Sequence, residues 1–147
     1  MSAVPQRQES IPRILLVEDN AADAALLVFL LESDGYAGTI DWVKDGEEAL
    51  SYLFRRGAHE KALPPDLIIL DLNLPKVNGI DILKSLREDS LTRGLPVIVM
   101  TTSSSDRDVK ASYELGVRSF FTKPKDLVEY ESLVKRILSS ELRANQS

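Results

Sequence analysis

The sequence contains no cysteine and only one histidine, His59. A chain without cysteine cannot form a disulfide, a thiolate nucleophile or a cysteine-based zinc site, and a single histidine cannot form a histidine metal cluster. Any metal ion bound by this chain must therefore use oxygen ligands.

Long apolar runs and an excess of basic residues are also missing. No apolar stretch approaches the ~20 residues of a membrane-spanning helix, and residues 1–10 resemble no signal peptide. The net charge of −5 argues against a sequence-independent grip on nucleic acid, which depends on Lys and Arg. We expect a soluble, cytoplasmic protein that binds neither nucleic acid nor membrane, with residues 1–11 as a disordered arm.

The 147 residues suffice for one hydrophobic core and leave no room for a second domain. Short apolar runs alternate five times with amphipathic stretches, which predicts an α/β fold with a doubly wound, five-stranded parallel sheet. Thr39–Val43 is the least apolar run and is predicted to be an edge strand. The other predicted strands are Ile14–Val17, Leu67–Leu70, Leu95–Thr102 and the stretch SFFTKPK, which ends at Lys123-Pro124.

Capping residues and glycines predict where the helices begin and end. Asn20 is predicted to cap the first helix, with Asp23 favourably placed in its first turn, and Gly35 is predicted to end it. The second helix is predicted over residues 47–57, and the fourth lies between Ser105 and Gly116.

Polar residues end four of the predicted strands. In a parallel sheet of this kind the carboxyl ends share one edge, where ligands bind. Three carboxylates at one edge repel each other, and a bound hard cation is the simplest reason to keep them together. Mg²⁺ fits because it takes few carboxylates together with waters, a backbone carbonyl and often a phosphoryl oxygen. The residues at this edge are Glu18, Asp19, Asp71, Thr101, Thr102 and Lys123.

Each of these residues also has an ordinary structural interpretation. The acids could be solvated side chains at strand ends, Lys123 could be a neutralising ion-pair partner, and the two threonines could simply be good strand formers. Together they supply acids for a cation, a lone Asp for nucleophilic attack, a hydroxyl and an ammonium. That combination is typical of a phosphoryl-transfer site.

The motifs LLVEDN, DLIILDLNLPKVNG, VIVMTTS and FFTKPK occur in this order. They resemble the motifs of response regulator receiver domains of the chemotaxis-regulator type. The resemblance covers about residues 12–140, so these residues are predicted to form the receiver domain and residues 141–147 a C-terminal tail. It implies a flavodoxin-like fold with strand order 2-1-3-4-5.

The resemblance also implies a role for each matched residue. Asp71 would accept the phosphoryl group, Thr101 would move onto a phosphoryl oxygen, and Lys123 would contact that group. The Lys123-Pro124 peptide would be cis, which would turn Lys123 towards this edge of the sheet. The Mg²⁺ ligands would be Glu18, Asp19, Asp71 and the carbonyl of Asn73.

Two positions depart from the commonest receiver pattern. Phe120 occupies the aromatic switch position, so switching cannot rely on a phenolic hydrogen bond. Thr102 stands where receivers often have a small residue, which could alter access to the phosphoryl group and hence its lifetime.

The implied function is that of a single-domain response regulator, a signalling protein rather than an enzyme, which accepts a phosphoryl group from a sensor histidine kinase. The segments RRGAHEKALPP and TTSSSDRDVKASYELGV are similar to those of small regulators paired with phytochrome-type photoreceptor kinases, so such a kinase is a candidate partner. One alternative is an aspartyl-phosphate hydrolase, which Asn73 disfavours because such phosphatases place a second Asp there. The other is a phosphorylation-independent binding scaffold, which the complete set of acids, Thr and Lys disfavours.

The sequence after Lys123 is long enough for one helix and a tail, so signalling is expected to pass through contacts with a downstream protein target. Apolar residues recur at helical spacing in this last helix, and they could face the core or a partner. We predict that they form the face of a homodimer favoured by phosphorylation. The residues of this face are Leu127, Tyr130, Val134 and Ile137, widened by Leu133, Leu138 and Leu142.

Overall fold

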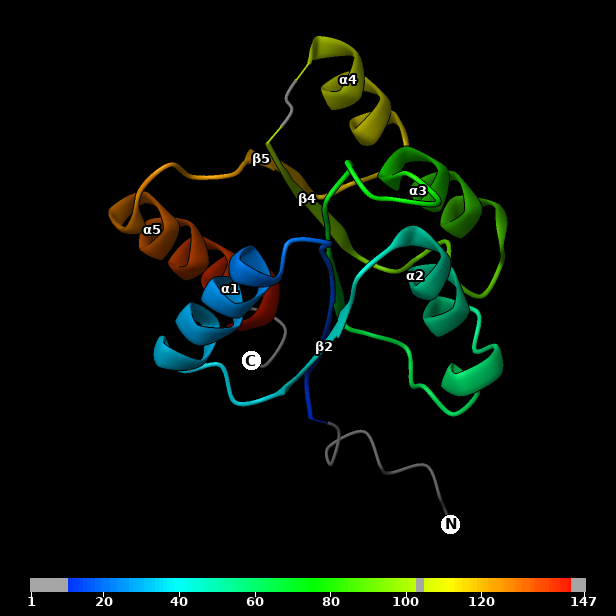
Figure 1. Ribbon diagram of the computed structural model, residues 1–147, viewed down its shortest axis with the longest axis horizontal. Helices are drawn as coiled ribbons and strands as arrows, with labels where there is room; N and C mark the ends of the chain where they lie inside the picture. Colours follow the sequence, from blue (N-terminus) through cyan, green and yellow to red (C-terminus); the bar gives the residue numbers. More distant parts are fainter. Residues whose placement is uncertain (1–10, 103–104, 144–147) are drawn as a thin grey trace.

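The computed structural model describes residues 11–102 and 105–143, in which five strands alternate with five α-helices (Figure 1). Residues 1–10 of the predicted N-terminal arm and residues 144–147 of the predicted tail lie outside the described ranges. The elements are β1 (Arg13–Val17), α1 (Ala21–Ser33), β2 (Thr39–Val43), α2 (Gly46–Leu53), a 3₁₀ turn η2 (Gly57–His59), β3 (Leu67–Leu70), α3 (Gly79–Glu88), β4 (Val97–Thr101), α4 (Asp106–Glu114), β5 (Ser119–Thr122), α5 (Leu127–Ile137) and a π-helical turn η3 (Leu138–Arg143).

The five strands form one parallel sheet in the order β2-β1-β3-β4-β5, which confirms the predicted fold and strand order. Strands β3 and β4 are buried along their whole length, whereas β2 lies at the edge and exposes Asp41 and Trp42. This difference follows from the sequence, because strands covered on both faces are continuously apolar and an edge strand is not.

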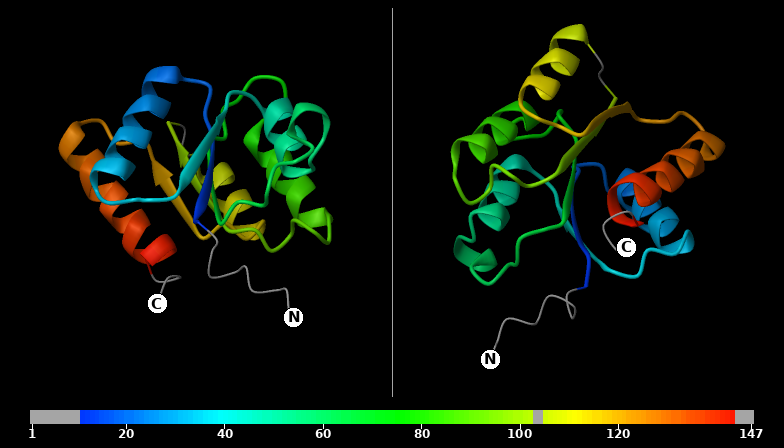
Figure 2. Two further views of the ribbon diagram at one scale, coloured as in Figure 1. Left: turned by 90° about the horizontal axis from the view of Figure 1, so that it is seen from below. Right: turned by 180° about the vertical axis from the view of Figure 1, so that it is seen from behind.

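Helices cover both faces of the sheet (Figure 2). Alternate residues of a strand point to opposite faces. Ile14 and Leu16 of β1 therefore join the core cluster beneath α1 and α5, while Leu15 and Val17 join the cluster beneath α2 and α3. Helix α4 packs beside α3. In the part of the chain that the structure describes, no helix combines the length and apolarity needed to cross a membrane.

Most predicted helix ends are confirmed. The side chain of Asn20 accepts a hydrogen bond from the backbone N–H of Asp23, and Gly35 and Gly116 follow helix ends with φ values of 100° and 79°. Helix α2 is shorter than predicted, because Arg55 adopts a left-handed φ of 55° directly after the cap residue Phe54. Residues with positive φ cannot continue a right-handed helix.

The predicted dimer face on α5 is wrong. Tyr130, Val134 and Ile137 are only 6%, 1% and 0% exposed, because α5 packs its apolar stripe against α1 and the sheet. The three leucines thought to widen this face are also buried. Of the predicted face only Leu127 is exposed, at 53%.

The packed part of the chain extends beyond the predicted domain end at residue 140. The turn η3 continues α5 to Arg143. Leu142 is buried in the core, and the buried Glu141 pairs with Arg118 at 2.6 Å. Residues 141–143 therefore belong to the domain rather than to a tail.

Candidate functional site

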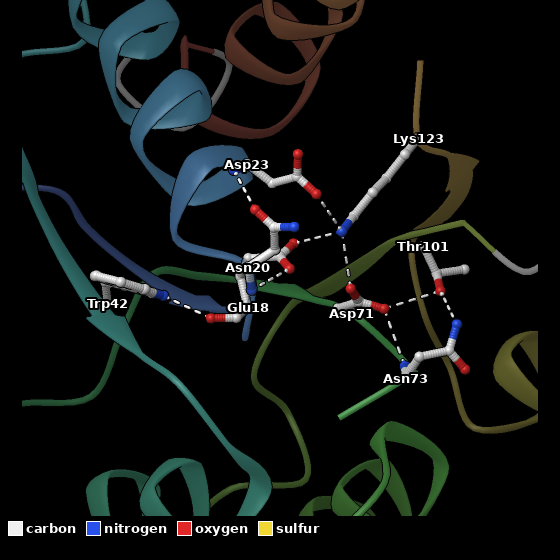
Figure 3. Close-up of polar contacts among 8 residues, drawn as sticks. All are labelled: Glu18, Asn20, Asp23, Trp42, Asp71, Asn73, Thr101 and Lys123. Atoms are coloured by element: carbon white, nitrogen blue, oxygen red, sulfur yellow. Dashed lines mark hydrogen bonds and ion pairs between the residues drawn. The ribbon is translucent and has the colours of Figure 1, made fainter. Parts of the chain in front are cut away.

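Four strands deliver polar side chains to one edge of the sheet (Figure 3). Glu18 follows β1 and Asp71 follows β3, and both are buried, at 5% and 4% exposure. Thr101 ends β4, and Lys123 follows β5. The structure thus brings together residues that lie far apart in the sequence, because parallel strands place their carboxyl ends side by side.

Three acids form the part of the site that could hold a cation. Carboxylate oxygens of Glu18, Asp19 and Asp71 all lie within 4.8 Å of one another. Burial raises the pKa of Glu18, an effect that hydrogen bonds from Lys123 and from the N–H of Asn20 oppose. An all-oxygen donor set that carries several negative charges fits a hard divalent cation such as Mg²⁺ or Mn²⁺.

Lys123 is the cation that the chain itself supplies. Its Nζ lies 2.8 Å from Glu18 Oε1, 2.9 Å from Asp23 Oδ2 and 3.0 Å from Asp71 Oδ2. Burial alone would lower the pKa of Lys123, but these hydrogen bonds outweigh burial and hold the pKa above its ordinary value. Lys123 therefore remains a charged donor across the physiological pH range.

The second oxygen of Asp71 is held by two further donors. Thr101 Oγ1 and the backbone N–H of Asn73 both donate to Asp71 Oδ1, at 2.9 Å each. The side-chain amide of Asn73 donates to Thr101 Oγ1 at 3.2 Å. Hydrogen bonds thus orient both oxygens of Asp71. Whether the carbonyl of Asn73 binds a metal stays a prediction.

The two positions that depart from the commonest receiver pattern differ in their exposure. Thr102 is exposed beyond the end of β4, next to the buried Thr101. Phe120 is partly buried and packs against the core cluster beneath α2 and α3. Their predicted roles in phosphoryl lifetime and switching stay predictions.

The predicted cis peptide between Lys123 and Pro124 is wrong, because the described residues contain no cis bond. The N–H of Lys123 donates to the carbonyl of Thr101 at 2.8 Å. The backbone pairing between β5 and β4 therefore continues for one residue beyond the end of β5. From this position the Lys123 side chain reaches Asp71 without a cis bond. The trans form is intrinsically favoured by about 0.5–1 kcal/mol.

Two residues at the site were not foreseen as part of it. The sequence indicates only a favourable position for Asp23 near the dipole of α1, yet its carboxylate forms an ion pair with Lys123. Trp42 lies opposite Leu16 in the register of β1 and β2, and its Nε1 donates to the backbone carbonyl of Glu18 at 2.6 Å. Asp23 lies one helical turn after the acid pair, which was the available sequence signal. For Trp42 the signal was its place near the end of the neighbouring strand.

Trp42 provides a reporter for metal binding. It is the only tryptophan, and it bonds the peptide that links Glu18 to Asp19. We expect a Mg²⁺ titration to change its emission, and Asp19→Asn to weaken Mg²⁺ binding by at least about tenfold, since even outer-shell changes have effects of this size. Glu88→Gln, which removes an exposed charge at the far end of α3, should leave the affinity unchanged. Calorimetric Mg²⁺ binding without any change in emission would contradict the expected reporter role.

Comparison with known proteins identifies the family to which the chain is similar. The family model of the response regulator receiver domain matches residues 14–137. The chain is 38% identical over 126 residues to response regulator Rcp1 of Synechocystis sp., with 86% of each protein covered. It is also 39% identical over 134 residues to the probable methanogenesis regulatory protein FilR2 of Methanothrix harundinacea, with 91% of this chain and 86% of that protein covered.

Solved structures agree with this match. The phosphorylated cyanobacterial phytochrome response regulator RcpA superposes with a TM-score of 0.87 at 37% identity, covering 92% of this chain and 96% of RcpA. The Mn²⁺-bound form of response regulator Rcp1 gives a TM-score of 0.85 at 37% identity, covering 90% of this chain and 95% of Rcp1. One relative thus carries a phosphoryl group and another a divalent cation.

Proposed function

Because the chain belongs to the response regulator receiver domain family, we propose that it is a phosphorelay switch that accepts a phosphoryl group on Asp71 from a sensor histidine kinase. The observation that carries the proposal is the environment of Asp71. This buried carboxylate lies at the end of the central strand β3, between the Lys123 ammonium on one oxygen and the Thr101 hydroxyl on the other.

The proposed chemistry is a transfer between two side chains. A carboxylate oxygen of Asp71 attacks the phosphorus of a phosphohistidine, a new P–O bond forms, the P–N bond breaks, and the histidine leaves. Lys123 and Thr101 donate hydrogen bonds to the phosphoryl oxygens. A Mg²⁺ ion held by Glu18, Asp19, Asp71 and the Asn73 carbonyl would neutralise charge on the phosphoryl group. Water later hydrolyses the acyl phosphate and restores Asp71.

Signalling follows from the change in charge. A phosphoryl group adds about −1.5 to −2 charges, and Thr101 would leave Asp71 Oδ1 to donate to it. We propose that this movement opens space for Phe120 to turn inward and changes the surface of α4, β5 and α5, which a downstream protein reads. A phosphorylation-favoured homodimer would have to use the exposed side chains of this surface, such as Leu127 and Val128, instead of the buried face of α5.

The kinase is proposed to be of the phytochrome type. Support comes from the similarity to RcpA, described as a cyanobacterial phytochrome response regulator. It also comes from the surface of α1, the helix that begins at the rim beside Asp71. The solvent side of this helix carries Ala22, Ala25 and Phe29, the last 64% exposed. An apolar solvent-facing side on a helix marks a partner surface, and a kinase that reaches Asp71 has to pass over this rim.

Phosphotransfer assays test both parts of the proposal. Radiolabel should pass to this chain from one member of a panel of phosphorylated histidine kinases that includes phytochrome-type kinases. We expect Phe29→Ser to slow transfer from that kinase about tenfold, as loss of an aromatic contact does, with no effect on phosphorylation by acetyl phosphate.

Leu91→Ser is the matched control for Phe29→Ser. Leu91 is 80% exposed and lies between α3 and β4, at the opposite end of the sheet from Asp71. This variant should receive label at the wild-type rate. Equal slowing by both substitutions would argue against α1 as the kinase surface, and failure of the entire panel to transfer label would argue against the phosphorelay function.

A further inference from the structure

Lys123 has no spare hydrogen-bond donor in this structure. A lysine ammonium carries three N–H bonds, and Nζ lies within 3.0 Å of oxygens of Glu18, Asp23 and Asp71 (Figure 3). A phosphoryl oxygen on Asp71 can therefore contact Lys123 only if one of these three carboxylates gives up its hydrogen bond.

The three carboxylates differ in what else could neutralise them. Glu18 and Asp71 belong to the group of acids, completed by Asp19, whose oxygens converge closely enough to share a cation. Asp23 does not belong to that group, and the cation that it contacts is Lys123. When a divalent ion neutralises the converging acids, Asp23 is the carboxylate that still pairs with the Lys123 ammonium.

The position of Asp23 is also fixed by the chain. Its backbone N–H donates to Asn20 Oδ1 at 3.0 Å, which anchors the residue in the first turn of α1. Its side chain is 35% exposed and reaches across to Lys123 at the end of β5. The first turn of α1 thus holds a negative charge next to the place where a phosphoryl group would add more negative charge.

We propose that Asp23 is a positioning residue that competes with the phosphoryl group on Asp71 for the Lys123 ammonium. This inference rests on the proposed phosphoryl-acceptor function. Asp23 favours the unphosphorylated arrangement in two ways: its ion pair holds the Lys123 ammonium, and its negative charge repels the phosphoryl group. The residue thereby lowers the affinity of the site for a phosphoryl group without contacting it.

Beryllofluoride, which mimics a phosphoryl group on a carboxylate, provides an equilibrium test. Its affinity is measured by calorimetry at a Mg²⁺ concentration that saturates each variant. We expect Asp23→Asn to bind beryllofluoride roughly three- to tenfold more tightly than the wild type, an effect below that of a fully buried charged hydrogen bond because Asp23 is partly exposed. Asp23→Ser removes the same charge and should give the same increase, whereas Asp23→Glu should restore affinity close to the wild-type value.

Asp81→Asn is the matched control, because it also removes a negative charge from the first turn of a helix. Asp81 follows the cap residue Asn78 of α3 as Asp23 follows Asn20, with its N–H bonded to Asn78 Oδ1 at 3.0 Å. This variant should bind beryllofluoride as the wild type does. Unchanged or weaker binding by Asp23→Asn and Asp23→Ser, beside normal binding by the wild type, would overturn the role of Asp23 alone. A wild type that does not bind the mimic would overturn the phosphoryl-acceptor function as well.

Discussion

Replacement of Asp71 with asparagine is expected to abolish phosphorylation by acetyl phosphate in the presence of Mg²⁺. The amide has nearly the shape of the carboxylate and can still accept hydrogen bonds from Thr101 and from the N–H of Asn73. It lacks the anionic oxygen that attacks phosphorus. We expect a loss of at least about hundredfold in rate, equivalent to about 2.7 kcal/mol in activation free energy. Radiolabel incorporation or intact-protein mass measures the product.

Asp66→Asn is the control for this experiment. Asp66 directly precedes β3, the strand that Asp71 follows, and it accepts a hydrogen bond from the N–H of Arg13 at 2.8 Å. The control therefore makes the same chemical change at the opposite end of the same strand. It should leave labelling unchanged. Label retained by Asp71→Asn would mean that another residue accepts the phosphoryl group.

Replacement of Lys123 with methionine is expected to destabilise the metal-free protein by about 3 kcal/mol. The Lys123 side chain is 9% exposed, and its buried partners Glu18 and Asp71 are 6% and 5% exposed. Methionine fills a similar volume but leaves these carboxylates without their cation, and removal of one partner of a buried pair costs about 3–5 kcal/mol. Urea unfolding in the presence of a chelator measures the change.

Lys135→Met separates this effect from the general loss of a lysine. Lys135 pairs with Asp34 at 3.4 Å but is 67% exposed, and an exposed ion pair contributes about 0–1 kcal/mol. The two variants should therefore differ clearly in their free energies of unfolding. Equal stability of the two would show that Lys123 is not needed to neutralise the acids.

Mg²⁺ and pH should both modify the Lys123→Met defect. A divalent ion that binds only the folded state adds about 2.7 kcal/mol at a concentration of 100 times its Kd, so Mg²⁺ should recover much of the lost stability. The pKa of Glu18 is already above its ordinary value of 4.5 because of burial, and loss of Lys123 removes the hydrogen bond that opposes this rise.

A carboxyl group with a raised pKa in the folded state binds its proton more readily there than in the unfolded chain. It therefore makes the fold less stable as the pH rises from the unfolded to the folded pKa. The stability difference between the wild type and Lys123→Met should accordingly narrow as the pH falls through the raised pKa of Glu18 towards 4.5. A difference that does not change with pH would argue against buried, unneutralised carboxylates as the cause.

The pattern of apolar runs was sufficient to predict the sheet and most helix ends. Continuous runs such as Leu67–Leu70 can be satisfied only by burial on both faces, and the polar residue that follows each run must then lie at the carboxyl edge. This logic is local to each strand. It is sufficient to predict that the acids, Thr101 and Lys123 lie at one edge.

The same local logic could not decide what covers a helix. An apolar stripe at helical spacing has the same sequence pattern whether it packs against the core or against a partner. In α5 this stripe packs into the core, with Tyr130, Val134 and Ile137. Helix α1, by contrast, leaves an apolar side exposed that includes Phe29. Which stripe is buried depends on how α1 and α5 pack together, and no single segment contains that information.

Local patterns were enough to predict which residues meet at the carboxyl edge of the sheet, because apolar runs mark the strands and all strands of a parallel sheet end at the same edge. Some strand bounds differ from the prediction by one or two residues, as for β4, which is Val97–Thr101. Three features could not be predicted from local patterns: Asp23 shares Lys123 with Asp71, Trp42 donates to the Glu18 carbonyl, and the Lys123-Pro124 peptide is trans. Asp23 and Lys123 are 100 positions apart. Contacts of this kind depend on the packing of whole helices and strands. The residues that surround each partner in the sequence do not indicate which distant side chain it will contact.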